Sequence, residues 1–294
     1  MNFKYIDAHT HTQFAAYDED RNDVIERALN AGIAMVNVGT NKETSESAVH
    51  LAEKYLGGVY VAVGIHPTHA SGSSHHDKKE TNLPPEELGE VFDRDFYKQL
   101  ATHEKVVAIG ECGLDYFRVD SEKLNVTSEK QKEVFIKHIE LAHGVGKPLM
   151  IHCRSAFPDL IELLTLNIKL LNPIPGIIHF FSGTKEDAKA LLELGFYFTF
   201  GGVITFLPRL AERSRGEAGV KDYDEIIKSI PIDRILSETD APYVTPAPYR
   251  GKRNEPSYVV KVVERLADLK GVSLDEMAEQ ILKNARAIFP SFVA

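Results

Sequence analysis

The chain has few cysteines, no long apolar stretch and no excess of positive charge, and each of these absences excludes a class of protein. Its two cysteines, Cys112 and Cys153, are too few for a disulfide framework, so a reducing cytoplasm is the simplest compartment. No apolar run reaches the roughly 18 residues that a membrane-spanning helix needs. The first residues read directly into a strand and carry no signal-peptide pattern. We therefore expect a cytoplasmic protein without a membrane segment.

The charge balance also limits the possible partners. The formal net charge of the 294 residues is −9, which argues against a broad basic surface for nucleic acid. A nuclease that holds a few nucleotides in a small cation-loaded pocket remains possible, because bound cations are often the largest local charges in a site. Nothing in the composition points to an obligate protein partner.

Short apolar segments alternate with longer amphipathic segments along the whole chain. Most of the short segments are apolar at nearly every position, which is typical of parallel strands covered by helices on both faces. No G-x-G-x-x-G follows the first of them, which argues against an open dinucleotide-binding sheet. Eight strand–helix units in a chain of this length predict one α/β domain over residues 1–294, a (β/α)8 TIM barrel. The expected strands are Tyr5–Ala8, Ala34–Val38, Val59–Val63, Val106–Ile109, Pro148–Ile151, Gly176–Ile178, Phe196–Phe200 and Arg234–Leu236.

Glycines mark the expected ends of several helices. We predict helices over Asp23–Ala31, Glu43–Tyr55 and Lys130–His143, closed by Gly32, Gly57 and Gly144, because a glycine just past a helix adopts the left-handed stop conformation. Residues 71–85 are polar and are expected to form a surface insertion that could alter access to the barrel mouth. Residues 209–224 are charged and fit either a helix or a loop.

Polar residues stand at the end of strand after strand. In a barrel these ends share one face, where active sites lie, and residues so costly to bury are tolerated there if they pair or bind a metal ion. The set is His9 and His11 after the first strand, His66 after the third, Glu111 after the fourth, His152 after the fifth, His179 after the sixth, and Glu238 and Asp240 after the eighth.

The spacing within this set has a mechanical reason. Residues two apart on a strand point to the same side, so His9 and His11 can reach one ion, and Asp7 could orient one of their rings from beneath. A carboxylate at Glu111 can bridge two cations in the arrangement that hydrolyses phosphate esters. Metal-assisted hydrolysis then gives Glu111, Glu238 and Asp240 as candidate catalytic residues, with the general acid–base role at Glu238 or Asp240.

Other groups near the strand ends are candidates for nucleophilic or substrate-binding roles. A cysteine nucleophile is a poor alternative, because Cys112 and Cys153 are expected to pack behind the site. Ser182 has no G-x-S-x-G context. Arginine suits bidentate phosphate contact, and Tyr116 or Phe117 could stack on a base. The candidate phosphate contacts are Arg118, Arg154, Arg250, Lys252 and Arg253, with Arg154 and Arg253 as the principal ones.

Taken in chain order, these motifs resemble the TatD family of metal-dependent deoxyribonucleases. The resemblance runs from the first strand to the last helix. Phe180, where the family usually has cysteine, and Ser237, where an aliphatic residue is common, depart from its pattern, and neither is a metal ligand. The matching stretches are residues 6–11 (IDAHTH), 63–67 (VGIHP), 109–116 (IGECGLDY), 151–154 (IHCR), 179–183 (HFFSG), 237–243 (SETDAPY) and 250–256 (RGKRNEP).

The resemblance implies an amidohydrolase-like barrel with two divalent metal ions that hydrolyses phosphodiester bonds in DNA, often from a 3′ end. One ion would be held by His9, His11, Glu111 and Asp240, and the other by Glu111, His152 and His179. His66 and Glu238 would position substrate or water, and the partner would be single-stranded DNA or a 3′ end.

Several alternatives stay open at this point. The ligand types suit Zn, Mn or Mg, and the motifs do not decide between DNA and RNA or between exonuclease and endonuclease. A hydrolase of the same barrel group could act instead on a lactone, amide, amine or phosphate ester, since fold does not fix substrate. A barrel that only binds nucleic acid or a partner protein is an alternative of another class.

Overall fold

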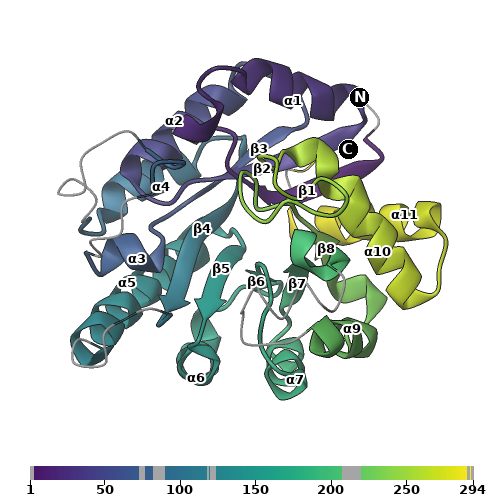
Figure 1. The fold of residues 1–294 in the computed structure, drawn as a ribbon. Helices are drawn as coiled ribbons and strands as arrows, with labels where there is room; N and C mark the ends of the chain where they lie inside the picture. Colours follow the sequence, from purple (N-terminus) through teal and green to yellow (C-terminus); the bar gives the residue numbers. More distant parts are fainter. Residues whose placement is uncertain are drawn as a thin grey trace.

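Eight parallel strands form one sheet that curls into a nearly closed barrel, with the helices arranged around its outside (Figure 1). The structure, a computed structural model, describes residues 3–72, 77–81, 90–117, 119, 124–206, 220–289 and 292. Each strand pairs in parallel with the next one along the chain, which confirms the predicted barrel. The strands are β1 (Tyr5–Thr10), β2 (Ile33–Val38), β3 (Val59–Val63), β4 (Val106–Asp115), β5 (Leu149–Arg154), β6 (Gly176–Ile178), β7 (Tyr197–Phe200) and β8 (Ile235–Ser237).

The helices follow the strands along the chain and cover the outer face of the sheet. The α-helices of the described residues are α1 (Arg21–Asn30), α2 (Lys42–Ala52), α3 (Pro67–Ala70), α4 (Arg94–Ala101), α5 (Leu124–Val145), α6 (Phe157–Leu166), α7 (Lys185–Glu193), α9 (Val220–Ser229), α10 (Val259–Lys270) and α11 (Leu274–Ile288). Short 3-10 turns are η1 (Ala15–Tyr17), η3 (Ile168–Leu170), η4 (Gly202–Thr205), η5 (Ile232–Arg234) and η6 (Pro256–Tyr258).

All eight predicted strands are present, and several extend beyond their apolar runs, β4 and β5 the furthest. β4 continues to Asp115 and β5 to Arg154, so Glu111 and His152 lie within strands rather than after them. The extension is possible because the two strands approach closely at Gly113, which pairs with His152 and has φ +128°. A Cβ at Gly113 would collide with the His152 carbonyl oxygen. The polar residues thus gain the fixed geometry of a sheet.

Two of the three predicted helix stops are wrong. Gly32 has φ +72° and follows α1 as expected. α2 ends already at Ala52, and the left-handed glycine after it is Gly58 rather than Gly57. α5 runs through Gly144, because the left-handed residue there is Gly146 with φ +65°. In both segments two candidate glycines lie close together, and the sequence alone does not select between them.

Contacts between β8 and β1 bring the two ends of the sheet together. Ser237 Oγ donates to the Ile6 carbonyl at 2.8 Å, so this departure from the family pattern has a structural use. Beyond the strands, Asp240 N donates to the His9 carbonyl at 2.9 Å, and His11 N donates to the Ala241 carbonyl at 2.9 Å. These bonds place the polar residues of the first and last strands next to one another.

Two predicted surface regions are only partly described. Of the insertion at 71–85, residues 71, 72 and 77–81 are described. Its segment 77–81 lies against the loops after β1 and β8: Ala15 N donates to the Glu80 carbonyl at 3.1 Å and Tyr243 Oη donates to Asp77 at 2.7 Å. Of residues 209–224, the part from Val220 onward belongs to α9, and 207–219 lie outside the described residues.

Candidate metal centre

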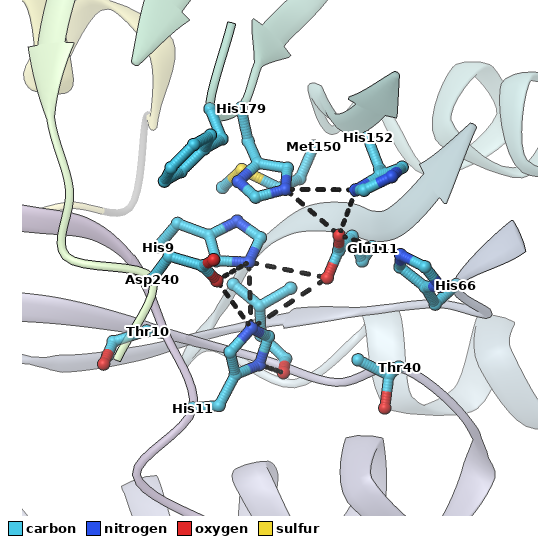
Figure 2. A network of polar contacts seen from close by, with 12 residues as sticks. His9, Thr10, His11, Thr40, His66, Glu111, Met150, His152, His179 and Asp240 are labelled. Atoms are coloured by element: carbon cyan, nitrogen blue, oxygen red, sulfur yellow. Dashed lines mark hydrogen bonds and ion pairs between the residues drawn. The ribbon is translucent and has the colours of Figure 1, made fainter. Parts of the chain in front are cut away.

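Polar side chains at the ends of six strands, β1, β3, β4, β5, β6 and β8, meet at one face of the barrel (Figure 2). Glu111 of β4 lies between two groups of histidines, one on the β1 side and one on the β5 and β6 side (Figure 2). The structure brings together all six residues that the sequence predicts as metal ligands: His9, His11, Glu111, His152, His179 and Asp240.

One oxygen of Glu111 faces the end of β1. Glu111 Oε2 lies 3.5 Å from His9 Nε2 and 4.0 Å from His11 Nε2, and these two nitrogens are 3.1 Å apart. Asp240 Oδ1 lies 3.4 Å from His11 Nε2 and 3.9 Å from His9 Nε2. Four potential donor atoms therefore surround one small volume.

The other oxygen of Glu111 faces β5 and β6. Glu111 Oε1 lies 3.0 Å from His152 Nδ1 and 3.1 Å from His179 Nε2, and these two nitrogens are 3.4 Å apart. His66 Nε2, from the end of β3, lies 3.5 Å from the same oxygen. A single carboxylate thus contributes one oxygen to each group.

These separations fit two divalent cations that share Glu111. Donors bound to one ion at about 2.0–2.2 Å lie about 2.8–3.6 Å apart for bond angles between a right angle and a tetrahedral one. The separations in the two groups run from 3.0 to 4.0 Å. The six side chains also supply the imidazole and carboxylate donors that such cations take, so the cluster has the donor set of a metal site.

Main-chain contacts decide which ring nitrogens can act as ligands. His11 Nδ1 lies 2.7 Å from the Val38 carbonyl, which can only accept, so Nδ1 carries the hydrogen and the Nε2 lone pair faces Glu111. His66 is arranged in the opposite way. Thr68 N donates to His66 Nδ1 at 3.2 Å, and burial lowers the pKa of His66 to about 3, so the neutral ring carries its hydrogen on Nε2. His66 therefore offers the pocket a hydrogen-bond donor, which suits a substrate oxygen better than a cation.

Electrostatics keep the central carboxylate ionised. Burial alone would raise the pKa of Glu111, but the charge of His179 and the hydrogen bond with His152 hold it well below its usual range. Burial also opposes a charge on His152, and its hydrogen bonds to Asp115 and Glu111 raise its pKa to about 9. A cation at His152 must displace a proton, so metal binding is expected to weaken as the pH falls.

Glu238 is fully buried beside the cluster rather than within it. Its Oε2 accepts a hydrogen bond from the Thr199 hydroxyl of β7 and lies 3.4 Å from His179 Nδ1. Thr199 Oγ1 in turn accepts from Phe180 N at 3.0 Å. Glu238 is held by its neighbours, with Oε1 left over.

The predicted ring-orienting role of Asp7 is wrong. Both Asp7 oxygens bind Thr239, through its backbone N at 2.8 Å and its hydroxyl, and the contact with His9 is to the backbone N at 3.4 Å. Asp7 fixes the main chain of β1 and the loop after β8, because the bulge of β1 between Asp7 and Thr10 breaks the simple alternation of side chains.

The predicted substrate contacts have different surroundings. Arg154 stacks on Phe117, with Cζ 3.5 Å from the ring centroid. Arg253 forms a bidentate ion pair with Asp20 at 2.9 and 2.6 Å and donates to the Ala16 carbonyl, which ties the loop after β8 to the start of α1. Arg253 therefore pairs with Asp20 and does not lie in the polar cluster around Glu111. Arg118 lies outside the described residues.

The remaining side groups have structural contacts. Burial raises the pKa of the Cys112 thiol well above its ordinary value, which keeps it protonated and unsuited to nucleophilic attack. Tyr116 Oη donates to Asp159 at 2.9 Å, and Arg250 stacks on Phe206.

Comparison with known proteins agrees with this geometry. Residues 6–290 match the family described as TatD related DNase. The chain belongs to the TatD family. It is 38% identical over 285 residues to an uncharacterized metal-dependent hydrolase of Bacillus subtilis, covering 97% of this chain and 98% of the relative. It is 35% identical to a protein of Erwinia billingiae named 3′-5′ ssDNA/RNA exonuclease TatD, covering 95% of each.

A solved structure of a TatD homologue from Escherichia coli K12 has the same fold, with a TM-score of 0.78, 27% identity and coverage of 99% of both chains. The chain is thus a metal-dependent hydrolase of the TatD family on a TIM barrel. None of the helices in the described residues is long and apolar enough to cross a membrane.

Sequence reasoning missed two residues that this TatD-family site uses. Asp115 Oδ2 lies 2.9 Å from His152 Nε2, and Gln131 of α5 bonds the backbone of Asp115 on both sides. Asp115 could have been found, because it is four residues after Glu111 and a continuing strand places both on one face. Gln131 left no such signal, since its contact with Asp115 depends on how α5 packs on β4.

Proposed function

We propose that this TatD-family hydrolase is a nuclease that cleaves phosphodiester bonds of single-stranded DNA from a 3′ end, with two divalent cations that share Glu111. The observation that carries the proposal is the position of Glu111, whose two oxygens face two different histidine groups at 3.0–4.0 Å. The relative named 3′-5′ ssDNA/RNA exonuclease supports the substrate class and keeps RNA as a second substrate to be tested.

The chain supplies the ligands, and the cations would supply the charge. When bound, two such ions lower the pKa of a water and stabilise the charge that develops on a phosphoryl group. We assign His9, His11, Glu111 and Asp240 to one ion, and Glu111, His152 and His179 to the other. The identity of the ions, Zn, Mn or Mg, is left to experiment.

Two further side chains fit roles in proton and substrate positioning. Glu238 has one oxygen held by Thr199 and one unpaired, so it can accept a proton from an attacking water beside His179. His66 presents Nε2–H next to Glu111 and can donate to a phosphate oxygen. No covalent enzyme intermediate is required.

Cleavage at the end of a DNA strand fits the charge of the protein. The net charge of −9 leaves little cationic surface to follow a long phosphate backbone. Arg154, held against Phe117 two residues beyond His152 on β5, is the side chain we assign to a phosphate next to the scissile one. One or two phosphate contacts suffice for a terminal nucleotide.

The test is a cleavage assay on chelated protein with Zn, Mn or Mg added back separately. The substrates are linear single-stranded DNA labelled at the 5′ or the 3′ end, its circular form, duplex DNA and RNA. We expect cation-dependent release of nucleotides from the 3′ end of linear DNA and no cleavage of the circle. Cutting of the circle would overturn the end preference.

The control is the Glu111→Gln variant, which keeps the shape of the side chain but loses the shared charge. The nuclease assignment fails if the protein cuts no nucleic acid with any cation while it still hydrolyses a small ester. A Glu111→Gln variant with normal turnover would remove the observation on which the proposal rests.

A further inference from the structure

Asp115, at the end of β4, is a carboxylate with a defined partner on each oxygen. Oδ2 lies 2.9 Å from His152 Nε2, and Oδ1 accepts a hydrogen bond from Phe117 N at 2.8 Å. Its backbone is also fixed, because Asp115 N donates to Gln131 Oε1 at 2.9 Å and Gln131 Nε2 donates to the Asp115 carbonyl at 3.0 Å. Asp115 and Gln131 are both buried. The carboxylate is therefore held in place independently of any ligand.

The contact with His152 determines which nitrogen of that ring keeps its hydrogen. An ionised carboxylate can only accept, so the hydrogen of His152 on this side resides on Nε2. Nδ1 faces Glu111 Oε1 at 3.0 Å and His179 Nε2 at 3.4 Å. The ionised Glu111 can also only accept, so Nδ1 carries a hydrogen too as long as no cation is bound. A cation would take the place of that hydrogen, and the hydrogen held by Asp115 would stay on Nε2. Carboxylates that hold the far nitrogen of a metal-binding histidine fix its tautomer and its orientation in many metal sites.

We propose that Asp115 is a positioning residue that fixes His152 as an Nδ1 ligand and, through its second oxygen, aligns the substrate-side platform of Phe117 and Arg154 with the cation. The platform follows from the stacking of Arg154 on the Phe117 ring, 3.5 Å from Cζ to the centroid. Arg154 and His152 are two residues apart on β5. One carboxylate thus joins a metal ligand to the side chain that we assign to phosphate. The inference rests on the proposed metal site and, for its second half, on the proposed substrate.

An asparagine at position 115 separates positioning from simple packing. It has nearly the same volume, but only one acceptor oxygen and one amide NH2 group. If the oxygen stays on Phe117 N–H, the NH2 group faces His152 Nε2 and favours the tautomer with hydrogen on Nδ1, which is then closed to a cation. If the oxygen turns to His152, Phe117 N–H loses its acceptor and the platform loosens. Either outcome breaks one of the two contacts of Asp115, the one with His152 or the one with Phe117 N–H.

The matched control is Asp159→Asn. Asp159 accepts hydrogen bonds from Tyr116 Oη at 2.9 Å and lies 2.9 Å from Lys132 Nζ, so it packs against the same loop. Among the described residues its hydrogen-bond and ion-pair partners are Tyr116 and Lys132, and none is a histidine. Phe117→Ala is the complementary variant, because it removes the platform and leaves the Asp115 carboxylate in place.

The experiment measures zinc binding to chelated protein by titration calorimetry, without nucleic acid. We expect two zinc ions per wild-type chain, and a 10- to 100-fold weaker affinity for one of them in Asp115→Asn. Asp159→Asn and Phe117→Ala should bind zinc as the wild type does, and Phe117→Ala should raise the KM for DNA. Wild-type affinity for both ions in Asp115→Asn would overturn the proposal.

A second measurement needs no variant and so does not depend on how Asp115→Asn folds. Long-range proton–nitrogen NMR spectra of the zinc-loaded wild type should show His152 with hydrogen on Nε2 and zinc on Nδ1. The reverse assignment would overturn the proposal. A wild-type chain that binds two zinc ions but cuts no DNA would remove the proposed nuclease function and leave the role of Asp115 intact, whereas one that binds no cation would remove both.

Discussion

His138, a buried histidine of α5, should make the fold sensitive to acid. Its Nδ1 lies 2.8 Å from the Val134 carbonyl, so Nδ1 carries the hydrogen, and its Nε2 accepts a hydrogen bond from Ile65 N at 3.0 Å. The ring thus ties α5 to the end of β3, next to His66. A proton on Nε2 would displace the Ile65 N–H, and burial lowers the pKa of His138 to about 4.

The size of the effect follows from that pKa. Because it lies below the ordinary value of 6.5, the unfolded chain binds the proton more tightly than the folded chain does. The stabilisation is complete above about pH 6.5 and is lost as the pH falls toward 4. Linkage at about 1.4 kcal/mol per pKa unit gives a loss of about 2.5 kcal/mol in the free energy of unfolding between pH 7.5 and 4.5.

The assay compares urea unfolding of the wild type and of His138→Gln across this pH range, with chelator present in both. Glutamine can offer an amide oxygen to Ile65 N–H and has no proton to gain. We expect the free energy of unfolding of His138→Gln to fall by about 2.5 kcal/mol less than that of the wild type. His138→Leu, which leaves the buried amide of Ile65 unpaired, should lose about 1–3 kcal/mol already at pH 7.5.

Parallel pH profiles of the wild type and His138→Gln would refute the reasoning. They would mean that His138 titrates in the folded chain as it does in the unfolded one. Since both proteins keep the same metal cluster, acid effects on that cluster cancel in the comparison.

Three other substitutions test the assignments at the barrel mouth. Glu111→Gln should lower turnover roughly 10²- to 10³-fold with an unchanged far-ultraviolet spectrum, because a neutral amide cannot balance the charge of two cations; a normal rate would exclude the sharing role. Arg154→Ala should slow DNA cleavage about 10- to 100-fold and slow hydrolysis of a nitrophenyl phosphodiester much less, since only DNA has a second phosphate. Equal losses on both substrates would place Arg154 at the scissile phosphate or at a carboxylate. Arg253→Ala should leave the KM for DNA unchanged and lower the free energy of unfolding by at most about 1 kcal/mol, because its partly exposed ion pair with Asp20 is structural. A raised KM would restore the substrate role of Arg253. With few phosphate contacts, the salt dependence of DNA binding in the wild type should be shallow.

The barrel and the convergence of the six polar residues could both be predicted because they depend on local patterns. Eight apolar runs without alternation require cover on both faces, and a parallel sheet with helices outside is the arrangement that supplies it. His9, Glu111, His152 and Asp240 each stand at the end of such a run, and all those ends share one face. Placement at a strand end therefore sufficed to bring the six residues together.

The contacts behind the ligands could not be predicted in the same way. The interpretation of Asp7 failed because a bulge in β1 and the approach of Thr239 decide where its carboxylate points. Arg253 was placed by Asp20, which is more than two hundred residues away in the chain. Such pairs depend on which loops adjoin one another, and side-chain type and spacing do not contain that information.

The sequence by itself determined which residues form the strands and which polar groups stand at their ends, because hydrophobic periodicity and strand direction are properties of neighbouring residues. The tertiary structure alone decided how the polar groups at those ends are arranged. Glu111 shares its oxygens between two groups, and the Val38 carbonyl and Asp115 hold one nitrogen each of His11 and His152. These contacts join different strands, so their geometry exists only after the strands have been wound into a barrel, and Asp115 is held further by α5 packed against β4.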